Sequence, residues 1–230
     1  PLSDLIQNEN YSRSTQVYVN AFADIKLWKG LVFRTEYAAN YNYNTGYRFT
    51  PSYDYEFFKQ QSSASRSAGN GSNWTLKTYL TYNGTFGKHN VSVMAGHEAQ
   101  ENNWESLDGS RTNFLFNSVH ELNAGDATTA KANSSRGSSA IESYFGRLNY
   151  NFADRYLLTA TLRADGSSSF AKESRWGWFP SVALAWKVNN EAFLKDVEAI
   201  NSLKLRLGWG VVGNQWAGSY AYGVTMASAA

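Results

Sequence analysis

The residue types that perform catalysis are present in this sequence but are not arranged for it. Asp165 and Glu173 could serve as the two carboxylates of glycoside cleavage, yet their spacing predicts no partner geometry, so carboxylates at the rim of a β-structure are the simpler interpretation. The serine run after Gly166 lacks the Gly-x-Ser-x-Gly spacing of a hydrolase nucleophile. The histidines show no metal-ligand spacing; they are His89, His97 and His120. We therefore expect no catalytic residues, no metal site and no cofactor.

Side chains suited to ligand binding gather elsewhere. The segment Arg175–Phe179 sets a cation beside aromatic rings, which could stack on a sugar or could form the aromatic belt of a membrane strand. Aromatic residues between 47 and 58 either pack within their own loop or bind a substrate or a partner protein. The candidate ligand-binding residues are Tyr53, Tyr55, Arg163, Asp165, Arg175 and Trp176.

Strict alternation of residue character predicts that β-strands position these side chains. From Tyr144 to Phe152 every second residue is apolar or small, and the pattern resumes from Tyr156 to Ala164. The polar break at 153–155 predicts a hairpin between the two strands. Each strand has about ten residues, which is enough to cross a bilayer at a tilt.

The last predicted strands show the same alternation with a sharper contrast. Large apolar residues lie on one face of 203–211, whereas Lys204 and Arg206 lie on the other. In a membrane barrel the apolar face contacts lipid. The predicted lipid-facing residues are Leu205, Leu207, Trp186 and Trp209. A soluble sandwich alternates in the same way, because its inner face is apolar and its outer face is wet, so the local pattern leaves both folds open.

The lengths of the connections separate the two folds. We predict eight strands, at about 14–25, 31–43, 74–86, 90–104, 142–152, 156–166, 181–188 and 203–212. Short turns alternate with long loops, which we place at 44–72, 107–138 and 166–178. Long loops at one end of the strands and short turns at the other are typical of an outer-membrane barrel. The exception is 189–202, a longer connection on the short-turn side that we predict to form a short helix.

The amino-acid composition further limits the class of protein. Charged residues make up 17% of the 230 residues, below the roughly 25% of soluble domains, while aromatic residues reach 16%. That combination suits barrel girdles and sugar-binding surfaces. A net charge of +2 gives no argument for nucleic-acid binding, and the absence of cysteine excludes disulfides. No run of about 18 apolar residues predicts a membrane helix. Because the chain starts at Pro1 without a signal peptide, we interpret it as a piece of a longer protein.

The ordered motifs of the C-terminal half resemble a known family. An Arg-Trp-Gly-aromatic-Phe-Pro-Ser segment at 175–181 precedes Glu-x-Phe-Leu at 191–194 and a Leu-Lys-Leu-Arg strand that ends in Gly-Asn at 203–214. This order is similar to the barrel of SusC/RagA-type TonB-linked (TonB-dependent) outer-membrane proteins of Bacteroidota. The detailed resemblance covers about 142–215, whereas residues 1–141 match in layout.

The resemblance implies an all-β fold, an antiparallel meander of about eight strands that forms an arc of a large, 22-stranded transmembrane barrel in the cell outer membrane. Residues 1–230 would be part of the barrel domain, without the plug domain and signal peptide. It implies energised uptake of a bulky nutrient, an oligosaccharide or a peptide, by binding and gating rather than catalysis, with Arg163 and Asp165 lining the lumen.

The implied partners are the TonB-ExbB-ExbD system, reached through an N-terminal part outside this sequence, a SusD-like surface lipoprotein, and outer-membrane lipids, with no nucleic acid. Two alternatives stay open. One is a structural or adhesive outer-membrane barrel without energised transport, and the other is a soluble carbohydrate-binding β-sandwich.

Overall fold

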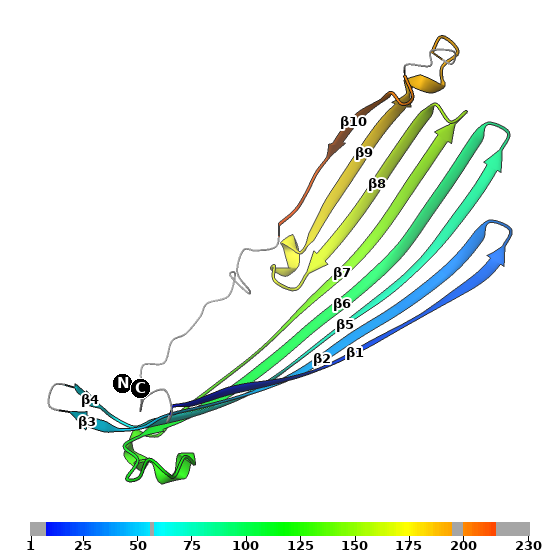
Figure 1. The fold of residues 1–230 in the computed structure, drawn as a ribbon. Coiled ribbons are helices and arrows are strands. Elements are labelled where there is room, and N and C mark those ends of the chain that lie inside the picture. Colours follow the sequence, from blue (N-terminus) through cyan, green and yellow to red (C-terminus); the bar gives the residue numbers. More distant parts are fainter. Residues whose placement is uncertain (1–7, 56–57, 195–199, 215–230) are drawn as a thin grey trace. The chain divides into compact units, whose positions relative to one another are not determined.

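The computed structural model describes residues 8–55, 58–194 and 200–214. Most of these residues form one eight-stranded sheet in the order β1-β2-β5-β6-β7-β8-β9-β10 (Figure 1). Its strands are β1 (Glu9–Trp28), β2 (Leu31–Thr50), β5 (Ser63–Phe86), β6 (His89–Thr112), β7 (Lys131–Phe152), β8 (Tyr156–Ser167), β9 (Trp176–Lys187) and β10 (Lys204–Gly210). A separate hairpin pairs β3 (Tyr53–Tyr55) with β4 (Phe58–Gln60). The predicted all-β meander of about eight strands is confirmed.

Helical structure in the described residues is limited to short 3-10 turns. They are η1 (Leu122–Ala124), η2 (Ala127–Thr129), η3 (Lys172–Ser174) and η4 (Val188–Asn190). None of the helical turns in the described ranges is long and apolar enough to span a membrane.

The predicted helix over 189–202 is wrong for the described residues of that segment. The chain makes the single turn η4 there, and residues 195–199 lie outside the described residues. Tertiary hydrogen bonds explain the difference, because the amides of Val188 and Asn189 both donate to the carbonyl of Leu203, at 2.8 and 3.3 Å. The Leu203 amide in turn donates to Asn189 Oδ1 at 3.2 Å. These bonds to the start of β10 outweigh a local helical spacing.

The strands are longer than their apolar pattern predicts. Much of the predicted loop 44–72 belongs to β2 and β5, and much of the predicted loop 107–138 belongs to β6 and β7. In these extensions polar residues occupy both faces, so the alternation of apolar and polar residues disappears. The backbone N–H and C=O groups still form hydrogen bonds with the neighbouring strands. The connections that remain are 51–62, which contains β3 and β4, 113–130 and 168–175.

Tight turns join the strands at the other end. The connections after β1, β5 and β7 are 29–30, 87–88 and 153–155. Each contains left-handed backbone, with positive φ at Gly30, Gly87, Ala153 and Asp154, which is the geometry that closes two strands with few residues. The predicted alternation of short turns and longer loops is therefore confirmed.

The chain divides into two compact units. The first comprises residues 1–19, 39–73 and 102–138, and the second comprises residues 20–38, 74–101 and 139–230. The first unit has a small apolar core in which Phe49, only 1% exposed, meets Phe114 edge-on with ring centroids 5.4 Å apart. The His120 ring stacks on Phe49 at 4.0 Å. This core packs the connection 113–130 against β2 and β5 within the first unit.

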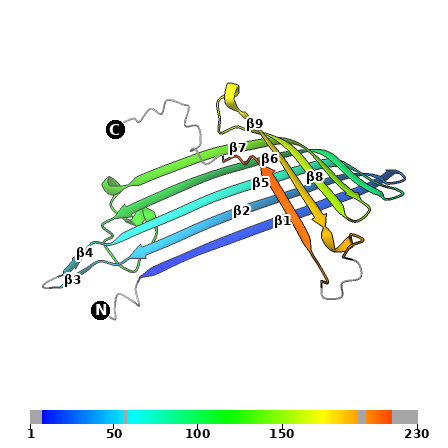
Figure 2. The ribbon, with the colours of Figure 1, turned by 90° about the horizontal axis from the view of Figure 1, so that it is seen from above.

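The second unit has two faces of opposite character. The strands β8, β9 and β10 lie side by side (Figure 2). Directly opposed residues in an antiparallel ladder point to the same side, and Leu158, Leu184 and Leu207 form one such row across these strands. We define the apolar face by the following residues: Tyr144, Leu148, Tyr150, Phe152, Tyr156, Leu158, Ala160, Leu162, Trp178, Pro180, Val182, Leu184, Trp186, Leu205, Leu207 and Trp209. The polar face lies on the opposite side of these strands.

The apolar face is open within the described part of the second unit. Leu184, Leu207 and Trp209 keep 51%, 75% and 64% of their surface exposed. A soluble sandwich would bury such a face under a second sheet. An apolar surface of this extent marks contact with another protein or with lipid.

Candidate functional site

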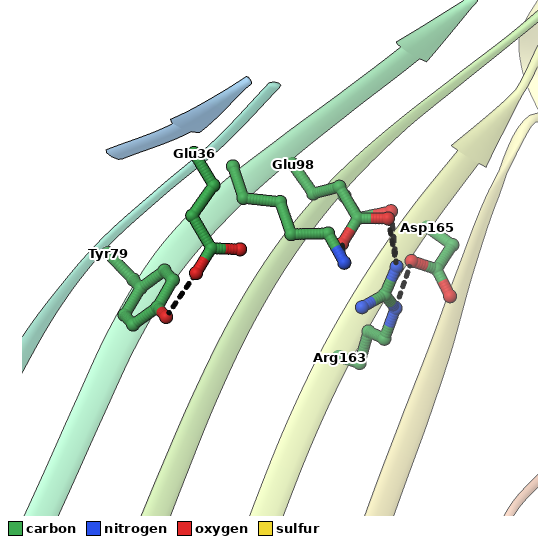
Figure 3. A network of polar contacts seen from close by, with 7 residues as sticks. Glu36, Tyr79, Glu98, Arg163 and Asp165 are labelled. Carbon is green, nitrogen blue, oxygen red and sulfur yellow. Dashed lines mark hydrogen bonds and ion pairs between the residues drawn. The ribbon is translucent and has the colours of Figure 1, made fainter. Parts of the chain in front are cut away.

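The polar face of the second unit carries a connected set of charges centred on Arg163. Its Nε donates to Asp165 Oδ1 at 2.6 Å and its Nη2 donates to Ser143 Oγ at 2.9 Å. Glu98 Oε1 lies 3.7 Å from the same guanidinium (Figure 3). The guanidinium also lies over the ring of Phe145. Alternation explains the arrangement, because Arg163 and Asp165 are two residues apart on β8 and Ser143 pairs with Asp165 across the ladder.

Further pairs continue the network across neighbouring strands. Lys77 Nζ lies 3.3 Å from Glu98 Oε2. Tyr79 donates its hydroxyl to Glu36 at 3.1 Å (Figure 3). Arg34 Nε lies 2.6 Å from the same carboxylate. These side chains are partly exposed, so each pair contributes at most about 1 kcal/mol. The network therefore orients polar groups on this face more than it stabilises the sheet.

A pocket of about 700 Å³ lies beside Arg163 in the second unit. Its charged lining consists of Glu98, Arg163, Asp165 and Arg175. The rest of its lining is Gln100, Ile141, Ser167, Phe170, Ser174, Trp176, Gly177, Phe179, Val211, Val212, Gly213 and Asn214. This volume falls in the range of small-ligand sites, which combine apolar walls with a few placed polar groups.

The candidate ligand-binding residues fall in both units. Arg163, Asp165, Arg175 and Trp176 line this one pocket, although they come from two strands and a loop. Tyr53 and Tyr55 belong to the first unit, on the β3–β4 hairpin. There Tyr53 donates its hydroxyl to Gln60 Oε1 at 2.8 Å. Phe57, among the loop aromatics considered above, lies outside the described residues. Binding by any of the six candidates stays a prediction.

The predicted lipid-facing residues differ in how exposed their side chains are. Leu205, Leu207 and Trp209 lie exposed on the apolar face, whereas Trp186 is half-buried and its indole Nε1 donates to Glu191 Oε1 at 3.0 Å. Tyr156 donates its hydroxyl to the same oxygen at 2.8 Å. Trp186 therefore lies at the polar limit of this face.

The residues around Glu191 form a cluster that the sequence did not predict. Arg155 Nη1 lies 3.0 Å from Glu191 Oε2, and we call Arg155, Tyr156, Trp186 and Glu191 the turn cluster. Hydrogen bonds from Trp186 and then Tyr156, with the charge of Arg155, lower the pKa of the Glu191 carboxyl. A carboxylate placed five residues after a strand-end Trp was the available signal, but only folding brings Arg155 to it. This cluster fixes the connection after β9 against the start of β8.

The remaining titratable residues are arranged for structure. Asp165 is engaged by Arg163, and Glu173 is exposed in η3. His97 Nε2 lies 3.1 Å from Glu142 Oε1, and the His97 ring packs near Tyr144. Within residues 8–55, 58–194 and 200–214, no group of three or more His, Cys, Asp or Glu side chains could hold a metal ion. The described geometry suits binding of a ligand by charge and shape.

Comparison with known proteins assigns the chain to a class. The family model for the TonB dependent receptor-like β-barrel matches residues 3–228, so the chain belongs to this family. The match extends well beyond the 142–215 segment in which the sequence motifs were recognised.

Individual relatives agree with this assignment. The chain is 42% identical over 154 residues to the TonB-dependent receptor SusC of Bacteroides thetaiotaomicron, covering 65% of this chain and 15% of the relative. It is 30% identical to the TonB-dependent receptor P39 of Formosa agariphila, covering 95% of this chain and 21% of the relative. The RagAB peptide importer in its open-open state has the same fold, with a TM-score of 0.87 at 22% identity over 94% of this chain and 24% of that chain.

The family determines the location and the class of protein. These barrels are outer-membrane proteins, and the family consists of transporters rather than enzymes. The soluble β-sandwich alternative is therefore wrong, in keeping with the open apolar face. The chain spans between 15% and 21% of the length of the curated relatives named above.

Proposed function

We propose that this chain forms part of the wall of a TonB-dependent outer-membrane transporter that takes up a bulky nutrient by binding and gating. The observation that carries the proposal is the contrast between the two faces of the second unit. One face is continuously apolar and exposed, and the other carries the Arg163 network and a pocket. A transporter wall needs both, because it meets lipid on one side and a polar solute on the other.

The dimensions of the apolar face support contact with lipid. From Trp186 to Trp178 on β9 there are eight steps of about 3.4 Å, and a strand tilt of about 40° converts this length to roughly 21 Å across the membrane. Outer-membrane barrels have an apolar band about 25 Å tall with aromatic residues at both limits. Trp186 and Tyr156 occupy one limit in this proposal, and Trp178 and Tyr144 occupy the other. Leu205, Leu207 and Trp209 then face lipid.

The pocket supports recognition of one part of a larger solute. Its volume of about 700 Å³ admits one or two sugar rings or amino-acid residues. Arg163 and Asp165 would present polar groups to the solute, and Trp176 and Phe179 would present rings. An oligosaccharide or a peptide fits this mixture. The two carboxylates of the pocket, Glu98 and Asp165, are paired with cations, which suits binding rather than bond chemistry.

The partners of the whole protein follow from the family. We place residues 1–230 in the barrel domain of a longer protein whose other parts include the plug and the contact to TonB. The TonB-ExbB-ExbD system would supply energy, and a SusD-like surface lipoprotein would cover the extracellular end. The SusC relative supports both assignments.

The test is uptake by the native bacterium. The full gene is deleted, and uptake of labelled oligosaccharide and peptide mixtures is compared with that of wild-type cells and of an ExbB-ExbD deletion. We expect one solute class to lose accumulation in both deletions. Normal accumulation of every tested solute without the gene would refute transport. Uptake that needs the gene but not ExbB-ExbD would refute energised transport.

A further inference from the structure

Within the part of the chain that the structure describes, Arg175 is the charged residue of the pocket whose guanidinium has no ion-pair partner. Its Nε is buried and has no hydrogen bond, and within the described residues no carboxylate lies within ion-pair distance of its guanidinium. Its carbonyl accepts from the Ser167 amide at 3.2 Å, which fixes the backbone at the end of the connection after β8. A buried donor left unpaired is costly and calls for an explanation.

The carboxylates of the pocket do not pair with Arg175. Asp165 accepts from Arg163, and Glu98 lies between Lys77 and Arg163. Glu173, two residues before Arg175, has an exposed side chain and does not line the pocket. The two pocket carboxylates are thus already engaged, and among the described residues Arg175 has the cationic group of this lining that lacks a counter-ion.

We propose that Arg175 binds the carboxylate of the transported solute, and that an apolar group next to this carboxylate packs on the pocket wall. The best match is the C-terminal residue of a short peptide with an apolar side chain. This inference rests on the proposed uptake function and specifies its solute. A guanidinium is suited to the task because its fork of N–H donors matches a carboxylate.

The walls favour an apolar amino-acid side chain over a sugar. Ile141, Val211 and Val212 are aliphatic, and Phe170 and Phe179 add two rings. Sugar hydroxyls placed against aliphatic walls would lose hydrogen bonds to water without replacement. Among the described residues, Arg163 already faces Glu98 and Asp165, so Arg175 is the pocket cation left for the carboxylate of the solute. The anionic end of the solute is therefore held at Arg175.

The experiment uses the purified full-length protein and a matched pair of probes. The probes are N-acetyl-Ala-Ala-Phe with a free C-terminal carboxylate and the same peptide as its C-terminal amide. Binding is measured by titration calorimetry, and maltotriose and a glucuronic-acid trisaccharide serve as glycan probes. A charge-assisted hydrogen bond predicts that the acid binds about tenfold to a hundredfold more tightly than the amide.

Two variants assign the effect to one residue. Arg175→Gln is expected to abolish the preference for the acid while leaving binding of the amide unchanged. Lys172→Gln removes an exposed cation from the same connection and is expected to keep the preference. The ratio of the two binding affinities, for the acid and for the amide, is measured on the wild-type protein and therefore tests the proposal even if a variant fails to fold.

Several outcomes would overturn the inference. They are equal binding of acid and amide, no binding of either peptide, tighter binding of the glucuronic-acid trisaccharide, and an equal loss of preference in both variants. Each of these outcomes is compatible with the proposed uptake function if accumulation of the solute in cells still depends on the gene and on ExbB-ExbD. Loss of that dependence would instead refute the proposed function itself.

Discussion

Arginine substitutions along the apolar face should cost stability according to their depth in the membrane. Leu205 pairs with Trp186, whose indole is bonded to the turn cluster, and Leu207 pairs with Leu184 two residues further along β9. Val182 lies two residues beyond Leu184. If this face meets lipid, the three substitutions Leu205→Arg, Leu207→Arg and Val182→Arg sample increasing depth.

The expected magnitudes follow from strand geometry. A rise of about 3.4 Å per residue at a tilt of about 40° moves each residue roughly 2.6 Å further from the interface. Relative to the level of Trp186, Leu184 is then about 5 Å deep and Val182 about 10 Å deep, close to the midplane of a 25 Å band. Arginine costs about 0–1 kcal/mol near the interface and about 2–4 kcal/mol at the midplane. Leu205→Arg should fall in the first range, Val182→Arg in the second, and Leu207→Arg between them.

The assay compares urea midpoints of the full-length protein folded into lipid vesicles, with heat-modifiable migration as the measure of folding. Ala183→Arg is the matched control, because Ala183 neighbours Val182 on the polar face. Arg206→Leu, also on the polar face, should have little effect on folding. The reasoning fails if Ala183→Arg is as damaging as Val182→Arg, or if Leu205→Arg is the most damaging of the series.

Three further predictions concern the two ends of the strands. Phe49→Ala removes a fully buried ring and should expose the connection 113–130 to proteases while membrane insertion is unchanged, because a buried Phe contributes about 3–5 kcal/mol to its local core. Asp154 has a pKa lowered from its ordinary value of 3.8, chiefly by the hydrogen bond from Lys187, so its stabilisation is complete above that pH and is lost as the pH falls through the depressed pKa. The difference in urea midpoint between wild type and Asp154→Asn should therefore stay constant above about pH 5 and narrow as the pH falls below 3.8. In intact cells, Ser118→Cys should react with an impermeant maleimide and Lys88→Cys should not, since we place the longer connections outside the cell and the tight turns in the periplasm.

Each of these predictions has its own control and contrary result. Leu115→Ala truncates an exposed side chain in the same connection and should leave protease resistance unchanged. Equal sensitivity of Leu115→Ala and Phe49→Ala would argue against the role of the core. A gap between wild type and Asp154→Asn that widens toward pH 3 would contradict the sign of the pKa shift, and asparagine tolerates the left-handed backbone of this turn. Labelling of Lys88→Cys but not Ser118→Cys would invert the orientation.

The alternation of apolar and polar residues predicted where the strands lie but not where they begin and end. The alternation from Tyr144 to Ala164 predicts β7 and β8 with their turn, and the ladder confirms that pairing. Beyond the apolar band the alternation stops although the strands continue, because there the backbone ladder, rather than an apolar face, holds the chain. The helix predicted over 189–202 failed for a related reason, since bonds to Leu203 decide that turn.

The sequence by itself determined the fold class, the sides on which Leu207 and Arg206 lie, and the family. These are properties of period-two alternation and of ordered local motifs, which need no knowledge of distant residues. Only the tertiary structure decided which charges neutralise one another. Glu98 and Arg163 are 65 positions apart, and their ion pair depends on registers in which a slip of one residue would turn each side chain to the other face. For the same reason, only the folded chain could show that the buried Nε of Arg175 has no hydrogen bond to any of the described residues.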